Sequence, residues 1–313
     1  MDLLPYNGTW ITCGSYALLN IAGLNPRHLI AVENSAGATF GMASLGTEWN
    51  YTRLLTPVRD FTCGVERCAS FWGLHLERQE ADSLQSVLEK PTQKDIKGYL
   101  IGPINMAKLT YLPIAQQYTN SDHFIAVRKT EQEKYCLIDS EGVIFSIDDI
   151  PSFCSMISGK GIPESEDRLN IWAVHMISNP CDPETLISHT IETASANFRY
   201  ALETGQGPGA FLKCNEVIVN TDESHWKISL GFDLDYLIQR RLMMKELIGA
   251  MKELNRKCSY SELEMTIDKQ IECAGSARYG LQYRDYGLLS DQLILLSEEE
   301  KILSERWEAW TAL

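Results

Sequence analysis

The sequence lacks the cysteine patterns that hold metals or build disulfide scaffolds. Its nine cysteines are scattered, odd in number and form no CxxC pair. Cys63 and Cys68 stand alone, because no histidine cluster joins them at the spacing of a zinc site. We therefore expect free thiols in a reducing compartment and no metal site.

Long apolar runs are also missing. No apolar window approaches the roughly 20 residues that a membrane-spanning helix needs. The N-terminal stretch "MDLLPYNGTW" has neither the basic region nor the apolar region of a secretory signal. We expect a soluble cytoplasmic protein with no membrane partner.

Basic residues are in short supply. The chain has 28 Lys and Arg against 42 Asp and Glu, which gives a net charge of −14. Binding to phosphates needs concentrated positive charge, so a nucleic-acid partner is not expected. The acidic balance suits cationic small molecules, although it also serves solubility alone.

What is present supports a packed core, since 44% of the 313 residues are hydrophobic. Residues 13–24 predict a buried helix, and residues 81–90 a short one. Apolar runs predict strands at 98–104, 123–129, 134–140, 142–147 and 169–177. Residues 30–62 are irregular and rich in Gly and Ala, which is typical of loops folded over a cleft. The first part of the chain, residues 1–178, is therefore predicted to be an α+β domain.

The character of the sequence changes after "SNPCDPE" (178–184), where two prolines mark a boundary. Apolar residues at helical spacing then predict helices at 184–203, 234–257, 261–275 and 289–310. We predict that residues 179–313 form a separate helical domain.

One cysteine stands where a helix should begin. Cys13 precedes the apolar run "GSYALLNIAGL". A cysteine in that position is usually a small buried core residue. A helix N-terminus nevertheless stabilises a thiolate, and a nearby imidazolium does so further. Cys13 is therefore a candidate nucleophile if a base and an orienting group can be found.

The candidate base and orienting group lie on one predicted β-hairpin. His123 opens its first strand and Asp139 lies near the end of its second. A register that places Val127 opposite Tyr135 also places His123 opposite Asp139, on the same face. Each residue alone has an ordinary explanation, as an edge histidine and a turn aspartate. Together with Cys13 they supply a nucleophile, a base and an orienting carboxylate.

An oxyanion site is predicted beside the thiol. The backbone N–H of Cys13 is one donor, and the side-chain amide of Asn7 is a candidate for the second. Asn7 also fits a capping or turn residue in "YNGT", and both interpretations remain open.

The order of Asn7, Cys13, His123 and Asp139 resembles that of papain-like enzymes, although Asn7 stands where papain has Gln and no aromatic residue follows Cys13. Longer stretches resemble the butirosin biosynthesis protein H N-terminal domain family of natural-product clusters. They are "CGSYALLNIAGL", "AVENSAGATFGM", "LIGPINMAKLTYLP", "SDHFIAVRK" and "YCLIDSEG". The resemblance covers about residues 5–155 and implies a papain-like fold.

The resemblance also implies a reaction, in which an acyl group passes from a carrier-protein thioester to an amine. Cys13 would attack the thioester, His123 would relay the proton, and Asp139 would orient His123. Asn7 and the Cys13 N–H would hold the oxyanion. The protein would need no cofactor of its own, because the phosphopantetheine arrives on the carrier protein.

Further candidates concern the acceptor and the carrier protein. Side chains for binding a cationic acceptor lie in the irregular segment: Glu33, Phe40 and Glu48. An acidic carrier protein would need a basic docking patch, for which the candidates on the helix 234–257 are Arg240, Arg241 and Lys245. Each of these charges also fits an ordinary solvated surface.

Two other functions remain open. A hydrolase would share the acyl-cysteine step and use water as the acceptor, as a peptidase, amidase or thioesterase does. A non-catalytic papain-like binding module would keep the fold without the reaction. The sequence leaves the oligomeric state open.

Overall fold

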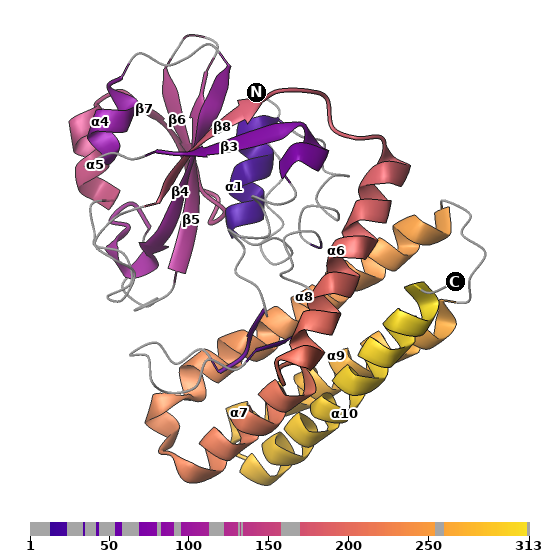
Figure 1. Ribbon diagram of the computed structural model, residues 1–313. Coiled ribbons are helices and arrows are strands. Elements are labelled where there is room, and N and C mark those ends of the chain that lie inside the picture. The colour runs from indigo at the N-terminus through magenta and orange to yellow at the C-terminus, as the bar shows by residue number, and fades with distance from the viewer. Residues whose placement is uncertain are drawn as a thin grey trace. The chain divides into compact units, whose positions relative to one another are not determined.

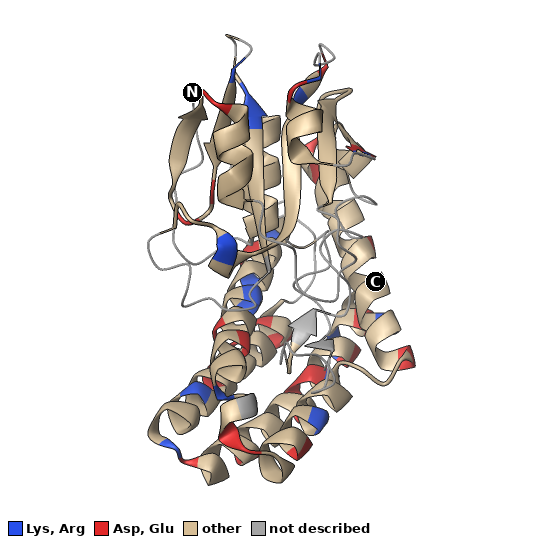
Figure 2. Ribbon diagram, turned by 90° about the vertical axis from the view of Figure 1, so that its left-hand side faces the viewer, with Lys and Arg blue, Asp and Glu red and all other residues tan. Residues whose placement is uncertain are grey.

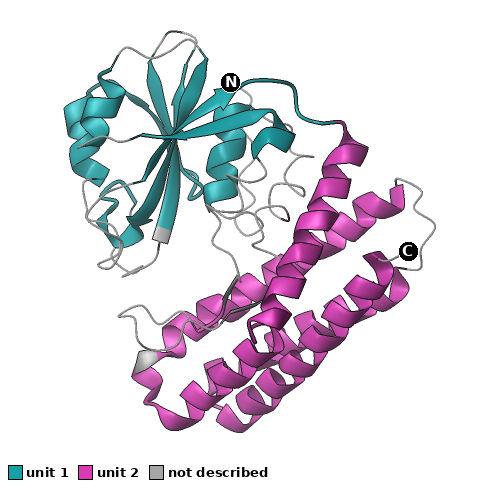
Figure 3. Ribbon diagram, in the orientation of Figure 1, with its two compact units in different colours: residues 1–29, 68–181 teal, residues 30–67, 182–313 magenta. Residues whose placement is uncertain are grey.

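A computed structural model describes residues 13–23, 34, 42–43, 54–57, 69–79, 83–90, 95–112, 122–130, 132, 134–157, 170–253 and 260–311. The chain divides into two compact units, coloured separately in Figure 3. Unit 1 comprises residues 1–29 and 68–181, and unit 2 comprises residues 30–67 and 182–313.

Unit 1 is built on a six-stranded antiparallel sheet with the order β3-β8-β4-β5-β6-β7. The strands are β3 (Leu74–Arg78), β4 (Ile96–Asn105), β5 (Asp122–Lys129), β6 (Tyr135–Ile138), β7 (Ile144–Ile147) and β8 (Ile171–Met176). The five predicted strands and the α+β class are confirmed. The sequence patterns miss β3, because this edge strand, "LHLER", buries little apolar surface.

One face of the sheet is covered by α1 (Cys13–Ala22), which packs against β4, β5 and β8 (Figure 1). All residues from Gly14 to Ala22 are buried, as expected for a helix that is apolar all round. The helix ends at Gly23, whose φ of 65° lies in the left-handed region that favours glycine. The helix predicted from the sequence is therefore confirmed.

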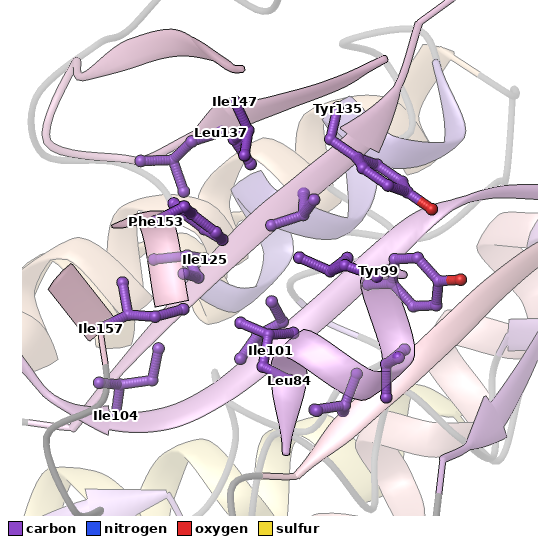
Figure 4. Close-up of a cluster of buried hydrophobic side chains, with 14 of the residues drawn as sticks. Leu84, Tyr99, Ile101, Ile104, Ile125, Tyr135, Leu137, Ile147, Phe153 and Ile157 are labelled. Carbon is purple, nitrogen blue, oxygen red and sulfur yellow. The ribbon is translucent and has the colours of Figure 1, made fainter. Parts of the chain in front are cut away.

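The other face is covered by α4 (Leu84–Leu88) and α5 (Ile150–Ile157) (Figure 1). Figure 4 shows side chains of both helices and of β4 to β7 pointing toward one another in a single apolar cluster. Within β5, Ile125 and Val127 belong to this cluster, as the period of two in a strand requires. The short helix expected at 81–90 is confirmed, whereas α5 is not predicted from the sequence.

Unit 2 is helical: α6 (Pro183–Glu203), α7 (Pro208–Asn220), the short 3₁₀ helix η4 (Glu223–His225), α8 (Lys227–Glu253), α9 (Ser261–Tyr283) and α10 (Tyr286–Thr311). One buried cluster surrounds Phe211 and Trp226, and another surrounds Phe198 and Trp307. The four helices predicted here are confirmed, whereas α7 is an addition. Among the described helices, none combines the length and the apolar character needed to cross a membrane.

Unit 2 also includes a segment that the sequence analysis places in the first domain. Leu54 and Leu55 are fully buried in the cluster around Trp226. Their backbone N–H groups donate to Oδ2 of the buried Asp233 on α8, at 2.9 and 3.0 Å. Two short strands, β1 (Met42–Ala43) and β2 (Thr56–Pro57), belong to the same segment. The division of the chain therefore differs from the predicted 1–178 and 179–313, because residues 30–67 group with the helices.

Candidate active site

Cys13 is the first residue of α1, and its side chain is only partly buried. Its Sγ accepts a hydrogen bond from the backbone N–H of Phe124 on β5, at 3.4 Å. The first N–H groups of a helix have no acceptor within the helix, and they create a positive local potential. The sulfur therefore lies where backbone donors favour a negative charge.

His123 and Asp139 are in direct contact. Nε2 of His123 lies 2.9 Å from Oδ1 and 3.0 Å from Oδ2 of Asp139. Both side chains are buried, His123 to 3% and Asp139 to 0% exposure. Because an ionised carboxylate only accepts hydrogen bonds, Nε2 carries the proton and Nδ1 is the nitrogen left to face a thiol.

The register of the β5–β6 hairpin differs from the prediction. Val127 pairs with Leu137, and not with Tyr135. The loop is closed by a hydrogen bond from the Thr130 N–H to the Lys134 carbonyl, at 2.7 Å, which shifts the pairing by two residues. A shift of two keeps every side chain on its face. His123 and Asp139 thus meet as diagonal neighbours and not as a directly opposed pair.

Asp139 lies in the tight turn between β6 and β7. Its carbonyl accepts from the Gly142 N–H at 3.1 Å, and its Oδ1 accepts from the Glu141 N–H at 2.8 Å. Its Oδ2 accepts from the hydroxyl of Tyr111 at 2.6 Å. Asp139 is therefore both the turn residue and the partner of the histidine, so the two interpretations of this residue do not compete.

The charges of the site reinforce one another. Burial by itself lowers the pKa of His123, but the Cys13 thiolate and the hydrogen bonds to Asp139 and to Cys13 raise it well above its usual value. Burial by itself raises the pKa of Asp139, but the contacts with His123, Tyr111 and the Glu141 N–H lower it below its usual value. This environment favours an imidazolium held between a thiolate and a carboxylate.

Gly102 on β4 allows this part of β5 to come close. A Cβ at this position would lie 2.5 Å from Cδ1 of Phe124 and 2.8 Å from the carbonyl oxygen of His123. The β4–β5 pairing is irregular at the same point, between Ile101 and Ile104. Absence of a side chain at Gly102 therefore helps to place the two site residues of β5.

A second buried histidine is arranged differently. His175 on β8 contacts Asp95 through Nδ1 at 2.8 Å and Glu77 through Nε2 at 3.2 Å. Both ring nitrogens are occupied by carboxylates, so neither is left to accept a proton from a nucleophile. This arrangement suits a structural bridge between strands and makes His123 the better candidate base.

Several predicted site residues cannot be placed. Asn7, proposed for the oxyanion site, lies outside the described residues. The same holds for the three candidates for acceptor binding, Glu33, Phe40 and Glu48. The structure thus brings together Cys13, His123 and Asp139 from the predicted set.

The candidates for carrier docking require a correction. Arg241 is fully buried and Arg240 is 2% exposed, so neither presents a basic surface. Arg241 continues the apolar stripe of α8, one turn after Leu237, and its Nη2 pairs with Oε2 of Glu300 at 2.5 Å. Lys245 is partly exposed but pairs with Asp268 at 2.6 Å. The two arginines are therefore interior residues.

The visible surface of the helical unit shows no replacement for that patch. Figure 2 shows acidic and basic segments interleaved along the helices of unit 2 in that view. Exposed pairs such as Arg278–Asp235, at 3.2 Å, place opposite charges side by side. This pattern is typical of a solvated helix surface.

Two contributors escaped the sequence analysis. Tyr111 is contained in the quoted stretch "LIGPINMAKLTYLP", but no spacing links it to Asp139. The N–H of Phe124 is a backbone group that any residue would supply. Only the folded chain shows that both reach the site.

Groups of three or more His, Cys, Asp or Glu able to hold a metal ion are not found among the described residues. The cysteines in the described part of the chain are free thiols: Cys13, Cys136, Cys154, Cys181, Cys214 and Cys273. The chemistry of the described site is therefore that of a thiol, an imidazole and a carboxylate.

Comparison with known proteins adds no family to this geometry. Neither a scan against protein-family models nor a search of curated proteins finds a match for the sequence. The functional argument therefore depends on the contacts of Cys13, His123 and Asp139, and on the resemblance of the short motifs around them.

Proposed function

We propose that this protein is a cysteine-dependent acyltransferase with a papain-like catalytic unit. The observation that carries the proposal is the convergence of three groups. A thiol at a helix start accepts an N–H from the strand that bears His123, and His123 is held by Asp139 at 2.9 and 3.0 Å. A buried helix headed by the nucleophile and packed on an antiparallel sheet that carries the base supports the papain-like assignment.

The first half-reaction forms an acyl-enzyme. The Cys13 thiol gives its proton to Nδ1 of His123, and Sγ attacks the carbonyl carbon of a thioester. The N–H of Cys13, at the start of the helix, donates to the oxyanion. When the intermediate collapses, the new S–C bond remains and the old one breaks. The departing thiolate takes the proton from His123 and leaves as a thiol.

The second half-reaction transfers the acyl group. An amine attacks the acyl-Cys13 carbonyl, the C–N bond forms, and the bond to Sγ breaks. His123 accepts the amine proton and returns it to Sγ. The net change is one thioester and one amine converted to one amide and one thiol, and Asp139 keeps His123 in the required orientation throughout.

The resemblance of the motifs supports the choice of donor and acceptor. It implies an acyl, aminoacyl or peptidyl thioester on a carrier protein, and an amine-bearing small molecule in secondary-metabolite biosynthesis. The net charge of −14 is compatible with a cationic amine. The basic docking patch expected on α8 gives no support, because Arg240 and Arg241 are interior residues.

The test is mass spectrometry with an acyl-thioester of N-acetylcysteamine, with and without amines. We expect one acyl adduct on the intact protein, its loss in Cys13→Ala, and an amide product when amine is present. Cys181→Ala is the matched control, because Cys181 is another partly buried free thiol of unit 1 and should keep the adduct. Free acid without amide would make the protein a hydrolase. Absence of an adduct with any thioester or amide would overturn the catalytic proposal and leave the binding module.

A further inference from the structure

The hydroxyl of Tyr111 donates to Oδ2 of Asp139 at 2.6 Å, on the side of the carboxylate that the Glu141 N–H does not hold. We propose that Tyr111 is a positioning residue, which acts through Asp139 to fix the His123 imidazole for proton exchange with Cys13. The proposal deepens the function above and rests on it for the role of Cys13.

The main chain of Tyr111 is anchored on both sides. It lies just after the 3₁₀ helix η2 (Met106–Lys108), in a turn closed by the hydrogen bond from the Leu112 N–H to the Leu109 carbonyl, at 3.0 Å. The preceding residue, Thr110, donates its N–H to the carbonyl of Met156 on α5, at 3.4 Å. The turn is thus attached to the helix that covers this face of the sheet.

The ring of Tyr111 is held by aromatic contacts. It packs edge-on against Phe145 of β7, with ring centroids 5.9 Å apart, and Phe145 packs against Phe153 of α5 at 6.3 Å. Such T-shaped contacts favour one orientation of each ring. The hydroxyl is therefore presented to Asp139 by a rigid support and not by a mobile side chain.

Each oxygen of Asp139 has one donor apart from the histidine. The Glu141 N–H holds Oδ1 at 2.8 Å, and the Tyr111 hydroxyl holds Oδ2 at 2.6 Å. Two fixed oxygens define the plane of the carboxylate, which leaves both nearly equidistant from Nε2 of His123. Without the hydroxyl, only one oxygen is held, and the carboxylate is free to turn away from the ring.

Tyr111 remains a donor wherever the site operates. Burial, followed by the negative charge of Asp139 and the hydrogen bond to it, raises the pKa of the Tyr111 phenol far above its usual value. The phenol therefore stays protonated over the range in which His123 loses its proton.

The first test is a double-mutant cycle on the rate of Cys13 alkylation by iodoacetamide, measured against pH. We expect Tyr111→Phe to lower the plateau rate about tenfold, the size of one lost hydrogen bond to a charged group. The alkaline limb should move to lower pH, because looser contacts with Asp139 raise the pKa of His123 less. In the Asp139→Asn background, Tyr111→Phe should have almost no further effect.

The matched control is Tyr135→Phe. Tyr135 is a buried tyrosine of the same hydrophobic cluster, and its hydroxyl interacts with Tyr99 and not with the site. We expect this variant to leave the rate and the pH profile unchanged. An unchanged profile in Tyr111→Phe, or an equal loss in both tyrosine variants, would overturn the positioning role. So would effects of Tyr111→Phe and Asp139→Asn that multiply in the double variant.

The second test does not depend on any reaction of Cys13. The proton on Nε2 of His123, observed by NMR with ¹⁵N-labelled histidine, reports directly on the bond to Asp139. We expect its signal to move upfield in Tyr111→Phe and to stay in place in Tyr135→Phe. If that shift occurs and no acyl adduct forms, the positioning role stands and the acyltransferase proposal fails. A signal unmoved in Tyr111→Phe overturns the positioning role even if acyl transfer is observed.

Discussion

The described cysteines differ in what surrounds the sulfur. Cys13 has a backbone donor at 3.4 Å and a histidine beside it. Cys214 and Cys273 lie in hydrophobic clusters, where burial raises the pKa of each thiol, and burial raises the pKa of Cys154 to about 11. Thiol chemistry at neutral pH should therefore distinguish Cys13 from these three residues.

Selective alkylation follows from that difference. At pH 7, limiting iodoacetamide should label Cys13 before Cys154, Cys214 and Cys273, as determined by peptide mapping. His123→Ala should slow labelling of Cys13 about tenfold or more, because the imidazolium no longer stabilises the thiolate. His175→Ala is the matched control, since it removes a buried histidine of the same sheet. Equal slowing in the two variants would show that His123 has no special relation to Cys13.

The raised pKa of His123 also predicts how stability depends on pH. Below its unfolded value of about 6.5, both states hold the proton and the full stabilisation is present. Above that pH, the folded state alone keeps the proton, so the free energy of unfolding should fall by about 1.4 kcal/mol per pH unit until the folded pKa is passed. The slope should disappear in His123→Gln.

Denaturant titrations at several pH values between 5 and 9 provide the measurement. The difference between wild type and His123→Gln should be largest at the acidic end and should shrink as the pH rises. In a Cys13→Ala background the window should be narrower, because the thiolate helps to raise the pKa. A difference that stays constant over this range contradicts the prediction.

Single elements in this protein are placed by a few close contacts. The β4–β5 irregularity brings Gly102 against Phe124 and His123. In unit 2, Arg241 of α8, Gln270 of α9 and Glu300 of α10 meet in the interior, where the Arg241 Nε donates to Gln270 and the Gln270 Nε2 donates to Glu300 at 2.9 Å. The first contact is steric and the second is polar, and the two should respond differently to substitution.

Gly102→Ala should disturb the site strand. The added methyl group would overlap the Phe124 ring and the His123 carbonyl, which we expect to cost about 1–3 kcal/mol of unfolding free energy. Cys13 alkylation should fall as well, because the strand that carries His123 has to move. Gly249→Ala on α8 is the control of opposite sign, since nothing lies near its Cβ and alanine favours the helix by about 0.5–1 kcal/mol.

Breaking the interior polar group of unit 2 should cost more than replacing it. Glu300→Leu alone leaves the Arg241 charge buried without its carboxylate, at a cost of about 3–5 kcal/mol. The triple variant Arg241→Met, Gln270→Leu and Glu300→Leu should be more stable than the single one. Glu300 Oε1 finds no hydrogen-bond partner within the described part of the chain, so the native pair is itself costly to bury. Unfolding by denaturant separates these outcomes, and a triple variant weaker than the single one would contradict the argument.

Considered as a whole, the chain does not divide at one point along its length. Residues 30–67 interrupt unit 1 and belong to unit 2. Asp233 links this segment to α8 by accepting the N–H groups of Leu54 and Leu55, and it is fully buried. A buried carboxylate without these donors would be unfavourable, so the segment and the helix depend on each other.

Asp233→Asn should therefore weaken unit 2 as a whole. An amide accepts less strongly from the two N–H groups, and we expect a loss of about 1–3 kcal/mol. Faster hydrogen exchange at the Leu54 and Leu55 amides would localise the effect. Asp235→Asn is the matched control, because its exposed pair with Arg278 should contribute no more than about 1 kcal/mol. Unchanged exchange at both leucines in Asp233→Asn would rule out the proposed link.

Most elements could be predicted from the sequence because their signals are local. The buried helix at Cys13, the five predicted strands and the four long helices each follow from a period of 3.6 or two in neighbouring residues. The parity that places His123 and Asp139 on one face is local in the same way, and it survived a register shift of two. The short edge strand β3 and helix α5 carry no comparable pattern.

Other features required the folded chain. Tyr111 reaches Asp139 because a turn after β4 is anchored to α5, which no spacing in the sequence encodes. Arg240 and Arg241 are charged residues whose burial depends on which face of α8 meets the neighbouring helices. Periodicity reports the geometry of one element, whereas these contacts depend on how separate elements pack, and packing is decided only when their faces meet.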